Sequence, residues 1–459
     1  MSNLKVYKFC DLYEMSSGIS SKPEQAGHGS PFLSFRTVFN NEFLPGFLQD
    51  LMDTSEKEKD TYSIKEGDIF LTRTSETLDE LGMSCVAVKD YPEASYSGFL
   101  KRLRPTQKDV TYHKFMAFYL RSYLFRKTMN NNAIMTLRAS LNEQIFSYLD
   151  LVLPSFEEQV KIGDFLYVIS KKIEVNNKIN QELEALAKTI YDYWFVQFDF
   201  PFDFAQDKPD QNGKPYKSSG GKMVYHTELK REIPEGWEGC KLGDVIEGAR
   251  TGLNPRQNFV LGEGDNYYVT IKNIKQGRVV LDEKCDKISD ESLEIINKRS
   301  DLKVGDILYT SIEPVGTTYL VRSKPKNWNI NESVFTIRPD YEKVSSEFLY
   351  MFLSGDYIKA YTKNVSAGSI HKGVRHSTLK DCKFILPPKN IVDHFTEKVS
   401  PILDKLEIIQ KENQKLVALR VWLLPMLMNG QVAVGGEILN QVQDDKLGMV
   451  AEESEEYKR

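Results

Sequence analysis

The feature that most constrains this chain is an internal repeat, because the second half restates the first at an offset of about 233 residues, as between Leu153 and Leu386. Self-similarity over such a period indicates a molecule built from copies of one structural unit. The matching strings are short, and the residues between them differ strongly. They are IKEGDI at 64–69 with LKVGDI at 302–307, LRP at 103–105 with IRP at 337–339, and LP at 153–154 with LP at 386–387.

A second sign of duplication is a pair of long stretches whose mainly apolar residues recur at alternating spacings of four and three. This heptad pattern is typical of helices that pack along one seam. Asn180 and Asn413 occupy equivalent seam positions, and a buried asparagine there fixes register and partner choice at some cost in stability. The first seam is Ile162, Leu166, Ile169, Ile173, Asn176, Asn180, Leu183, Ala187, Ile190 and Trp194, and the second is Phe395, Val399, Ile402, Leu406, Ile409, Asn413, Leu416, Arg420, Leu423 and Leu427.

The helical stretches set the predicted domain boundaries. Ser155 and Glu158 have the spacing of a helix-capping box. The first helix is therefore expected at 155–198, with a length of about 60 Å at about 1.5 Å per residue. The second is expected at 390–428, where Pro401 predicts either a kink or a later start. The other predicted segments are a first domain at 1–150, a linker at 199–233, a second domain at 234–385 and an acidic tail at 431–459.

Both predicted domains have mixed secondary-structure character. Short β-type runs follow a glycine turn at 68–72 and 306–310, and helical stretches are expected at 113–127 and 346–363. The prediction is a mixed α/β, or α+β, fold with two similar domains of about 150 residues each.

Composition narrows the class of protein. No run of about 18 apolar residues is present, and the start of the chain lacks the basic-then-apolar form of a signal peptide. The five cysteines include no CxxC pair, so we interpret them as free thiols and expect a reducing, cytoplasmic location. The net charge of −5 is unevenly distributed along the chain, because the segment 96–138 contains nine Lys and Arg residues and one acidic residue. Such a segment suggests contact with a polyanion, although solvated helix faces would give the same pattern.

Motifs for catalysis are not found in the sequence. It contains neither a GxxxxGK[ST] phosphate loop nor GxGxxG. The stretch at 339–343 resembles a nuclease pattern, but its Glu and Lys are adjacent and would point to opposite faces of a strand, so a turn is expected. The string LPPK at 386–389 lacks the flanking residues with which an amino-methyltransferase holds a flipped base. His371, His376 and Cys382 are too widely spaced for a typical zinc site, so no metal site is predicted.

Several strings resemble the specificity (S) subunit of Type I restriction–modification enzymes. They are LPSFEEQ at 153–159, which opens the first helix, IPEGWE at 233–238, which enters the second domain, and YDYWFV at 191–196 with GKPY at 213–216. The similarity covers about 1–430. The second half departs from the pattern, because NIV at 390–392 stands where the first helix has EEQ.

The resemblance implies an architecture and a function. The two helices would pack antiparallel as a coiled-coil spacer between two target-recognition domains, in a pseudo-twofold arrangement. Each domain would read one half of a bipartite double-stranded DNA site. The chain itself would be non-catalytic and would bind no cofactor. Methylation would come from docked modification subunits, two in number, and cleavage from restriction subunits, so S-adenosylmethionine, ATP and Mg²⁺ would be used by these partners. No membrane partner is expected.

The candidate DNA contacts are polar residues, most of them basic, in segments that differ between the two domains. Arg and Lys match the edge of guanine and Asn matches that of adenine, although contact with phosphate is the commoner role for a basic residue. They are Arg36, Thr37, Arg73, Arg126 and Arg138 in the first domain, and Lys272, Asn273, Arg278, Lys372, Arg375 and His376 in the second.

Two other classes of protein stay open at this point. A methyltransferase or nuclease with a fused recognition domain would need donor-binding and catalytic motifs. A coiled-coil scaffold without DNA contact would bind no duplex. A variant of the main prediction is the specificity subunit of a system in which methyltransferase and nuclease share one polypeptide.

Overall fold

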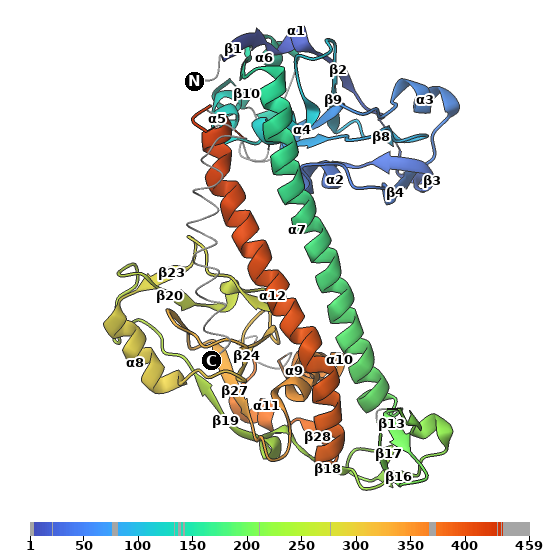
Figure 1. Cartoon of the computed structure of the whole chain (residues 1–459), viewed down its shortest axis with the longest axis vertical. Coiled ribbons are helices and arrows are strands. Elements are labelled where there is room, and N and C mark those ends of the chain that lie inside the picture. Colours follow the sequence, from blue (N-terminus) through green and yellow to red (C-terminus); the bar gives the residue numbers. More distant parts are fainter. Residues whose placement is uncertain are drawn as a thin grey trace. The chain divides into compact units, whose positions relative to one another are not determined.

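The computed structural model describes residues 4–20, 22–75, 81–132, 134–135, 139–140, 143–210, 212–275, 277–366, 373–428, 430–432 and 434. Within these residues the chain forms two compact units. We call them unit 1, from 1–175 and 413–459, and unit 2, from 176–412. Each unit contains one mixed α/β domain and a part of both long helices (Figure 1).

The domain of unit 1 contains a four-stranded antiparallel sheet of order β2-β9-β5-β7 and a three-stranded sheet of order β4-β3-β8, in which β3 is antiparallel to β4 and parallel to β8. The strands are β1 (Lys5–Lys8), β2 (Tyr13–Ser17), β3 (Ala26–Leu33), β4 (Asp50–Met52), β5 (Ile69–Thr72), β6 (Thr74–Ser75), β7 (Ser84–Val86), β8 (Ser95–Tyr96), β9 (Leu100–Pro105), β10 (Ile134–Met135), β11 (Ala139–Ser140) and β12 (Asp150–Leu153). The helices are α1 (Phe9–Leu12), α2 (Phe35–Asn40), α3 (Glu56–Thr61), α4 (His113–Tyr119), α5 (Tyr123–Asn132) and α6 (Glu143–Tyr148), with a 3₁₀ turn η1 (Pro23–Gln25).

The domain of unit 2 has the same two sheets, of order β19-β27-β24-β25 and β23-β20-β26. The strands are β18 (Glu238–Lys241), β19 (Ile246–Thr251), β20 (Asn266–Val269), β21 (Ile274–Lys275), β22 (Arg278–Val279), β23 (Asp286–Ile288), β24 (Ile307–Thr310), β25 (Thr318–Leu320), β26 (Trp328–Ile330), β27 (Val334–Pro339) and β28 (Lys383–Leu386). The helices are α8 (Asp290–Ser300), α9 (Ser346–Ser354), α10 (Asp356–Ser366) and α11 (His376–Lys380), with 3₁₀ turns η5 (Leu242–Val245) and η6 (Ile271–Asn273).

The repeat extends to the register of the strands. The first strand of each domain pairs with its last, and Lys5 lies opposite Leu153 in unit 1 as Glu238 lies opposite Leu386 in unit 2. Register is set where burial distinguishes the two faces of a strand, because a slip of one residue would turn every side chain over. The internal repeat predicted from the sequence is therefore confirmed in the fold.

A central strand explains one of the repeated strings. In β5, Ile69 and Leu71 face a core shared with the helices, whereas Phe70 faces a second core under the other sheet. Side chains alternate along a strand, so a strand buried on both faces is an unbroken apolar run. Strand β24 divides its residues in the same way, with Ile307 in one core and Leu308 in the other.

The aspartate of each GD string forms a buried ion pair. Asp68, which is fully buried, accepts hydrogen bonds from Nε and Nη2 of Arg104 at 2.7 and 2.6 Å. Asp306 is also fully buried and accepts from the same atoms of Arg338, at 2.7 and 2.9 Å. In both units the arginine also donates to a backbone carbonyl, that of Ser63 in unit 1 and Asp301 in unit 2.

Two long helices, α7 (Phe156–Tyr191) and α12 (Lys389–Met428), carry the heptad seams. In unit 1 the early part of α7 packs on the late part of α12, since Ile162 and Leu166 share a core with Leu423 and Leu427. In unit 2 the late part of α7 packs on the early part of α12, where the Tyr191 and Phe395 rings are 6.0 Å apart. The two helices are therefore antiparallel within each unit (Figure 1).

The residues predicted for the seam lie inward. Every one of the predicted seam residues is buried or half-buried, and the polar Asn176, Asn180 and Asn413 are buried among them. The side-chain amide of Asn176 donates to the Glu412 carboxylate at 2.7 Å, so this buried amide nitrogen has a hydrogen-bond partner.

The helix ends differ in part from the expectation. Helix α7 is followed by a π-helical turn at Asp192–Val196, within the predicted range of 155–198. Helix α12 continues through Pro401, which therefore does not mark its start. The helical stretch predicted at 113–127 is interrupted at 120–122, between α4 and α5. The predicted acidic tail at 431–459 lies almost entirely outside the described residues.

The polar composition of 199–233 predicts a linker, and the structure gives this segment secondary structure. It contains the strands β13 (Pro201–Asp203), β14 (Lys208–Pro209), β15 (Lys214–Pro215), β16 (Met223–His226) and β17 (Arg231–Pro234), and the 3₁₀ turn η4 (Lys217–Ser219). Aromatic stacking anchors it, because the ring of Phe200 lies 4.7 Å from Tyr216 and 5.3 Å from Trp237. The mixed α/β fold with two similar domains and two long helices is confirmed.

Candidate nucleic-acid interface

Backbone hydrogen bonds bring several strand ends together at one end of the domain of unit 1. Ser97 N donates to Leu33 O at 3.0 Å, and Arg73 N donates to Phe99 O at 2.9 Å. This links the start of α2, which carries the exposed Arg36, to the end of β5, which leads to the exposed Arg73. We call this region, residues 17–20, 33–37, 73 and 97–99, the loop end of unit 1.

The equivalent residues meet at one end of the domain of unit 2. Asn331 N donates to Val269 O at 2.9 Å, and Val374 N donates to Ser311 O at 2.8 Å. These bonds, together with that from Ser311 N to Ser333 O, place the segment before η6 close to the segment before α11. We call it the loop end of unit 2, residues 251–253, 269–273, 311–312, 330–333 and 373–376. It holds the predicted contacts Lys272, Asn273, Arg375 and His376.

The two predicted dipeptides, Arg36-Thr37 and Lys272-Asn273, occupy equivalent places. Each lies in the short helical turn after the parallel strand pair, behind an N-cap at Ser34 or Thr270. Arg36 and Lys272 are exposed, so each domain presents a cation at this point. Thr37 N donates to the Ser34 hydroxyl at 3.4 Å. Asn273 is largely buried, and its Oδ1 accepts from Thr270 N and Oγ1, both at 2.9 Å, so its amide oxygen has a structural use.

Other predicted contacts interact with groups of the chain itself or lie outside the described residues. Arg126 is on α5, and its Nη1 donates to the carbonyl of Leu81. Arg278 is in β22, and its charge acts on Glu184 of helix α7. Arg138 and Lys372 lie outside the described residues. The assignment of individual contacts to DNA stays a prediction.

His376 lies at the start of α11 against an aromatic ring. The centroids of the His376 and Phe335 rings are 3.8 Å apart in an edge-on arrangement. Burial lowers the pKa of the imidazole, and the positive charge of Lys380 lowers it further. The imidazole is therefore neutral near pH 7 and is able to donate or accept one hydrogen bond at each nitrogen rather than to carry charge.

The basic segment at 96–138 is largely occupied with internal contacts. Lys101 donates to the Ser17 hydroxyl at 2.8 Å, and Arg102 donates to Ser63 O at 2.8 Å. Arg121 donates to three backbone carbonyls. Most of the described cations in this segment therefore donate hydrogen bonds within the chain, whereas Lys108 and Lys127 are exposed.

Two exposed residues near the loop ends were not among the predicted contacts. Phe99 is 65% exposed beside Arg73, although an aromatic residue before a strand is more typical of a core. Arg256 is exposed in the turn at 254–258 that follows β19. The Asn-Pro-Arg string at 254–256 was a usable signal for a loop, whereas nothing in the sequence marks Phe99 as exposed.

The outer faces of the long helices expose apolar side chains. Val168 in unit 1 and Leu186 in unit 2 are exposed on α7, and Ile408 in unit 2 and Val421 in unit 1 are exposed on α12. Single exposed apolar residues are common, and a protein-binding surface is indicated only where such residues form a contiguous patch. No helix among the described residues is long and apolar enough to span a bilayer. The described ranges also hold no group of three or more His, Cys, Asp or Glu residues placed to bind a metal.

Comparison with known proteins gives a consistent result. Residues 1–185 and 234–418 each match the family described as the Type I restriction modification DNA specificity domain. The chain is 26% identical to the Type I restriction enzyme HindI specificity subunit of Haemophilus influenzae, over 94% of this chain and all of that one. It is 23% identical to the MjaIX specificity subunit of Methanocaldococcus jannaschii, over 94% of this chain and 93% of that one.

A solved structure has the same fold. The S subunit of a Type I restriction–modification system from M. genitalium superimposes with a TM-score of 0.60 at 14% identity, over 93% of this chain and 96% of that one. The two family matches follow the internal repeat, and each includes one domain and most of the helix that follows it. The chain therefore belongs to the family of Type I restriction–modification DNA specificity subunits and carries two copies of the specificity domain.

Proposed function

We propose that this chain selects the DNA target of a Type I restriction–modification complex by reading a bipartite site, one half with each domain. The observation that carries the proposal is the pair of equivalent loop ends. They share one backbone framework but differ in side chains. Arg36, Arg73 and Phe99 in unit 1 correspond to Lys272, Ser311 and Ser333 in unit 2. Two copies of one scaffold with different side chains would read two different half-sites.

Members of this family are the non-catalytic DNA-recognition subunits of Type I enzymes. Modification subunits, two in number, would dock on the outer faces of α7 and α12, where Val168, Leu186 and Ile408 are exposed. Restriction subunits would join through them. S-adenosylmethionine, ATP and Mg²⁺ would then be bound by these partners rather than by this chain, and the complex would act in the cytoplasm. The alternative partner is a single polypeptide that contains both methyltransferase and nuclease.

The direct experiment is sequencing of methylated bases in the host genome with and without this gene. The proposal expects one bipartite methylated motif to vanish when the gene is deleted and to return when it is restored. An unchanged methylation pattern, in a host whose partner genes are intact, would contradict the proposal.

A second experiment separates recognition from catalysis. The purified chain should bind duplex DNA that contains the motif weakly when alone and tightly together with its modification subunits. The chain alone should neither methylate nor cut this DNA. Methylation or cleavage by the chain alone would identify an enzyme with a fused recognition domain. Failure to bind any duplex, even with the modification subunits present, would favour a scaffold.

A further inference from the structure

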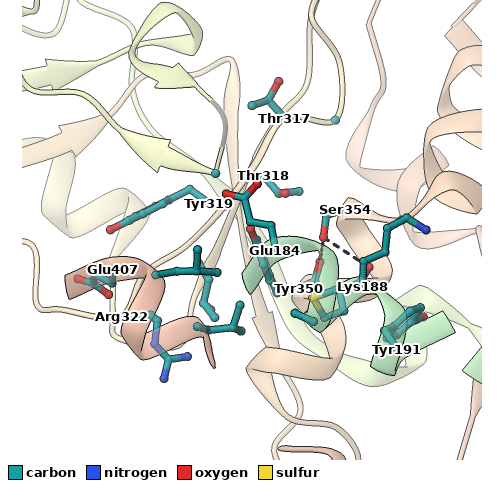
Figure 2. Close-up of a pocket in the computed structure, with 18 of the residues that line it drawn as sticks. Glu184, Lys188, Tyr191, Thr317, Thr318, Tyr319, Arg322, Tyr350, Ser354 and Glu407 are labelled. Atoms are coloured by element: carbon teal, nitrogen blue, oxygen red, sulfur yellow. Dashed lines mark hydrogen bonds between the residues drawn. The ribbon is translucent and has the colours of Figure 1, made fainter. Parts of the chain in front are cut away.

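Unit 2 contains a cavity of about 450 Å³ between its domain and the two helices. Its walls come from α7 (Glu184, Ala187), the turn before β25, α9 (Tyr350, Ser354) and α12 (Leu403) (Figure 2). This volume is within the range of small-molecule sites.

Unit 1 fills the equivalent region with two guanidinium groups. Arg121 Nε donates to Ser84 O at 2.8 Å, and its Nη2 donates to Asn41 O at 2.7 Å. Arg420 Nη1 donates to Glu42 Oε2 at 2.8 Å and to the Ser170 hydroxyl at 3.0 Å. Arg420 thus joins helix α12 to the domain and to helix α7.

The internal repeat identifies the counterparts of these arginines in unit 2. The turn after α4, in which Ser122 N donates to Tyr119 O at 3.0 Å, is repeated after α9, where Gly355 N donates to Phe352 O at 3.1 Å. Ser354, which precedes Gly355, therefore stands where unit 1 has Arg121. The shared heptad register places Ala187 where unit 1 has Arg420.

The cavity wall contains the counterpart of a residue that accepts a hydrogen bond from a guanidinium group in unit 1. Thr318 pairs with Tyr309 as Ser84 pairs with Leu71, so Thr318 is the counterpart of the residue whose carbonyl accepts from Arg121. Thr318 and Ser354 both line the cavity, but each arginine has been replaced by a smaller side chain. The cavity is thus the space that two arginine side chains occupy in the other half of the chain.

Of the acids that line the cavity, Asp192 and Glu407 form ion pairs, whereas Glu184 interacts with the charge of Arg278 and forms no ion pair among the described residues. Three described cations line the cavity. Arg322 bonds Glu347 and Lys188 bonds Asp192, whereas Lys359 is exposed to solvent, and the acid Glu407 accepts from Lys411 at 2.9 Å. Glu184 is an exposed residue whose side chain lies beside Thr318 and Tyr350 at the cavity (Figure 2). Burial raises the pKa of this carboxyl group, and the charge of Arg278 opposes that rise. A partly desolvated carboxylate is stabilised by a cation that donates hydrogen bonds to it.

We propose that this cavity binds a guanidinium group on an alkyl chain, with the cation on Glu184 and the alkyl chain along Leu403. The group comes either from a free small molecule or from an arginine side chain of a bound protein. Its effect is the one that Arg420 has in unit 1, which is to join the domain to the helix pair. Occupancy would therefore fix the position of the second domain on its helices.

The test uses the full chain with butylguanidinium as the probe and butylurea as a neutral probe of similar shape. Butylguanidinium at millimolar concentration should raise the melting temperature saturably, and butylurea should not. Glu184→Gln should weaken the binding of butylguanidinium at least tenfold. Glu182→Gln, an exposed acid on the same helix that does not line the cavity, is the matched control and should bind like the unmodified chain. Ser354→Arg should supply the guanidinium internally and abolish the response.

An equal response to both probes, retention of binding in Glu184→Gln, or no saturable response in the unmodified chain would overturn the proposal. Because Ser354→Arg could fail to fold, the comparison of Glu184→Gln with Glu182→Gln decides the question. Repeating the titration with the modification subunits bound separates the two sources. Loss of the probe response identifies an arginine of the partner in the cavity, and an unchanged response identifies a free small molecule. None of these measurements depends on DNA recognition.

Discussion

At the scale of single residues, the buried ion pairs explain why the GD and RP strings occur in both halves. Asp306 is fully buried and the side chain of Arg338 is 12% exposed, so the pair is shielded from water. Removing one partner of such a pair leaves an uncompensated charge, which costs more than the pair contributes.

The first prediction concerns this pair. Asp306→Asn should lower the free energy of unfolding by about 3 kcal/mol, measured by urea denaturation of the full chain. The matched control is Arg250→Gln, which breaks the exposed pair between Arg250 and Asp301 and should cost less than about 1 kcal/mol. Equal losses for the two variants would show that burial of the pair has no special importance.

The second prediction concerns His376 and pH. Since burial lowers the pKa of His376 in the folded chain, the unfolded chain binds more protons below pH of about 6.5. The contribution of His376 to stability is therefore complete above that pH and is lost as the pH falls toward the lowered pKa. His376→Gln should remove this component from the pH profile of unfolding, whereas His28→Gln, on the exposed part of β3, should leave it. A profile that His376→Gln does not change would be inconsistent with the lowered pKa.

At single residues, the sequence identifies cations but not their surroundings. The sequence predicts Arg36 and Lys272 as DNA contacts from their own segments, and the two residues lie at equivalent exposed positions. Arg126 was predicted on charge alone, and the structure directs it to a backbone carbonyl. Positive charge in a sequence does not distinguish a cation that faces solvent from one that donates to carbonyls of its own domain, because that choice depends on tertiary packing.

At the scale of elements, the two long helices begin at equivalent positions but are held differently. Ser155 and Glu158 form the predicted capping box at the start of α7. Gln159, buried at the same helix start, accepts from Tyr112 N at 3.0 Å and donates to Val110 O at 2.9 Å. The EEQ string is thus a structural clamp between helix and domain.

Helix α12 uses another set of contacts. Val392 occupies the place of Gln159, and the Thr396 hydroxyl instead donates to the Ser345 hydroxyl at 2.7 Å. Arg322 reaches Asp404 of the helix and Glu347 of the domain. The sequence predicts this difference, because NIV replaces EEQ, but it does not predict what takes the place of the clamp, since the partners are distant in the chain.

The third prediction follows from the clamp. Gln159→Leu removes the side-chain partner of three backbone groups, Tyr112 N, Val110 O and the buried Pro154 O, and should destabilise the chain by about 2 kcal/mol in thermal or urea unfolding. Glu157→Ala, at an exposed position of the same turn, should leave the unfolding midpoint close to that of the unmodified chain. If Gln159→Leu were as stable as the control, the clamp would have no energetic role.

At the scale of the whole molecule, the sequence determines the repeat and the helix seam most firmly. Both depend on local periodicity and on self-similarity, which are readable without tertiary structure. The folded segment at 199–233 was not predicted, because its polar composition conceals the aromatic residues Phe200, Tyr216 and Trp237 that stack on one another. Stacking partners far apart in sequence cannot be identified from composition.

The fourth prediction concerns the spacing of the two half-sites. Insertion of one heptad into both α7 and α12 preserves the seam and lengthens each helix by roughly 10 Å. Under the proposed function, the methylated motif should keep both half-sites and gain about three base pairs of spacer, measured by sequencing of methylated bases. Insertion of a heptad in α7 alone is the control and should abolish activity of the complex. Altered half-site sequences after the paired insertion would contradict the division of roles between domains and helices.

The most direct measurement for the two-domain mechanism is an exchange of residues 1–150 for the corresponding domain of a related specificity subunit, followed by sequencing of methylated bases in cells with intact modification subunits. Because each domain has its own core and its own loop end, one half of the bipartite motif should change, and the other half should stay the same. A change in both halves, or in neither, with a complex that still methylates DNA, would contradict the assignment of one half-site to each domain.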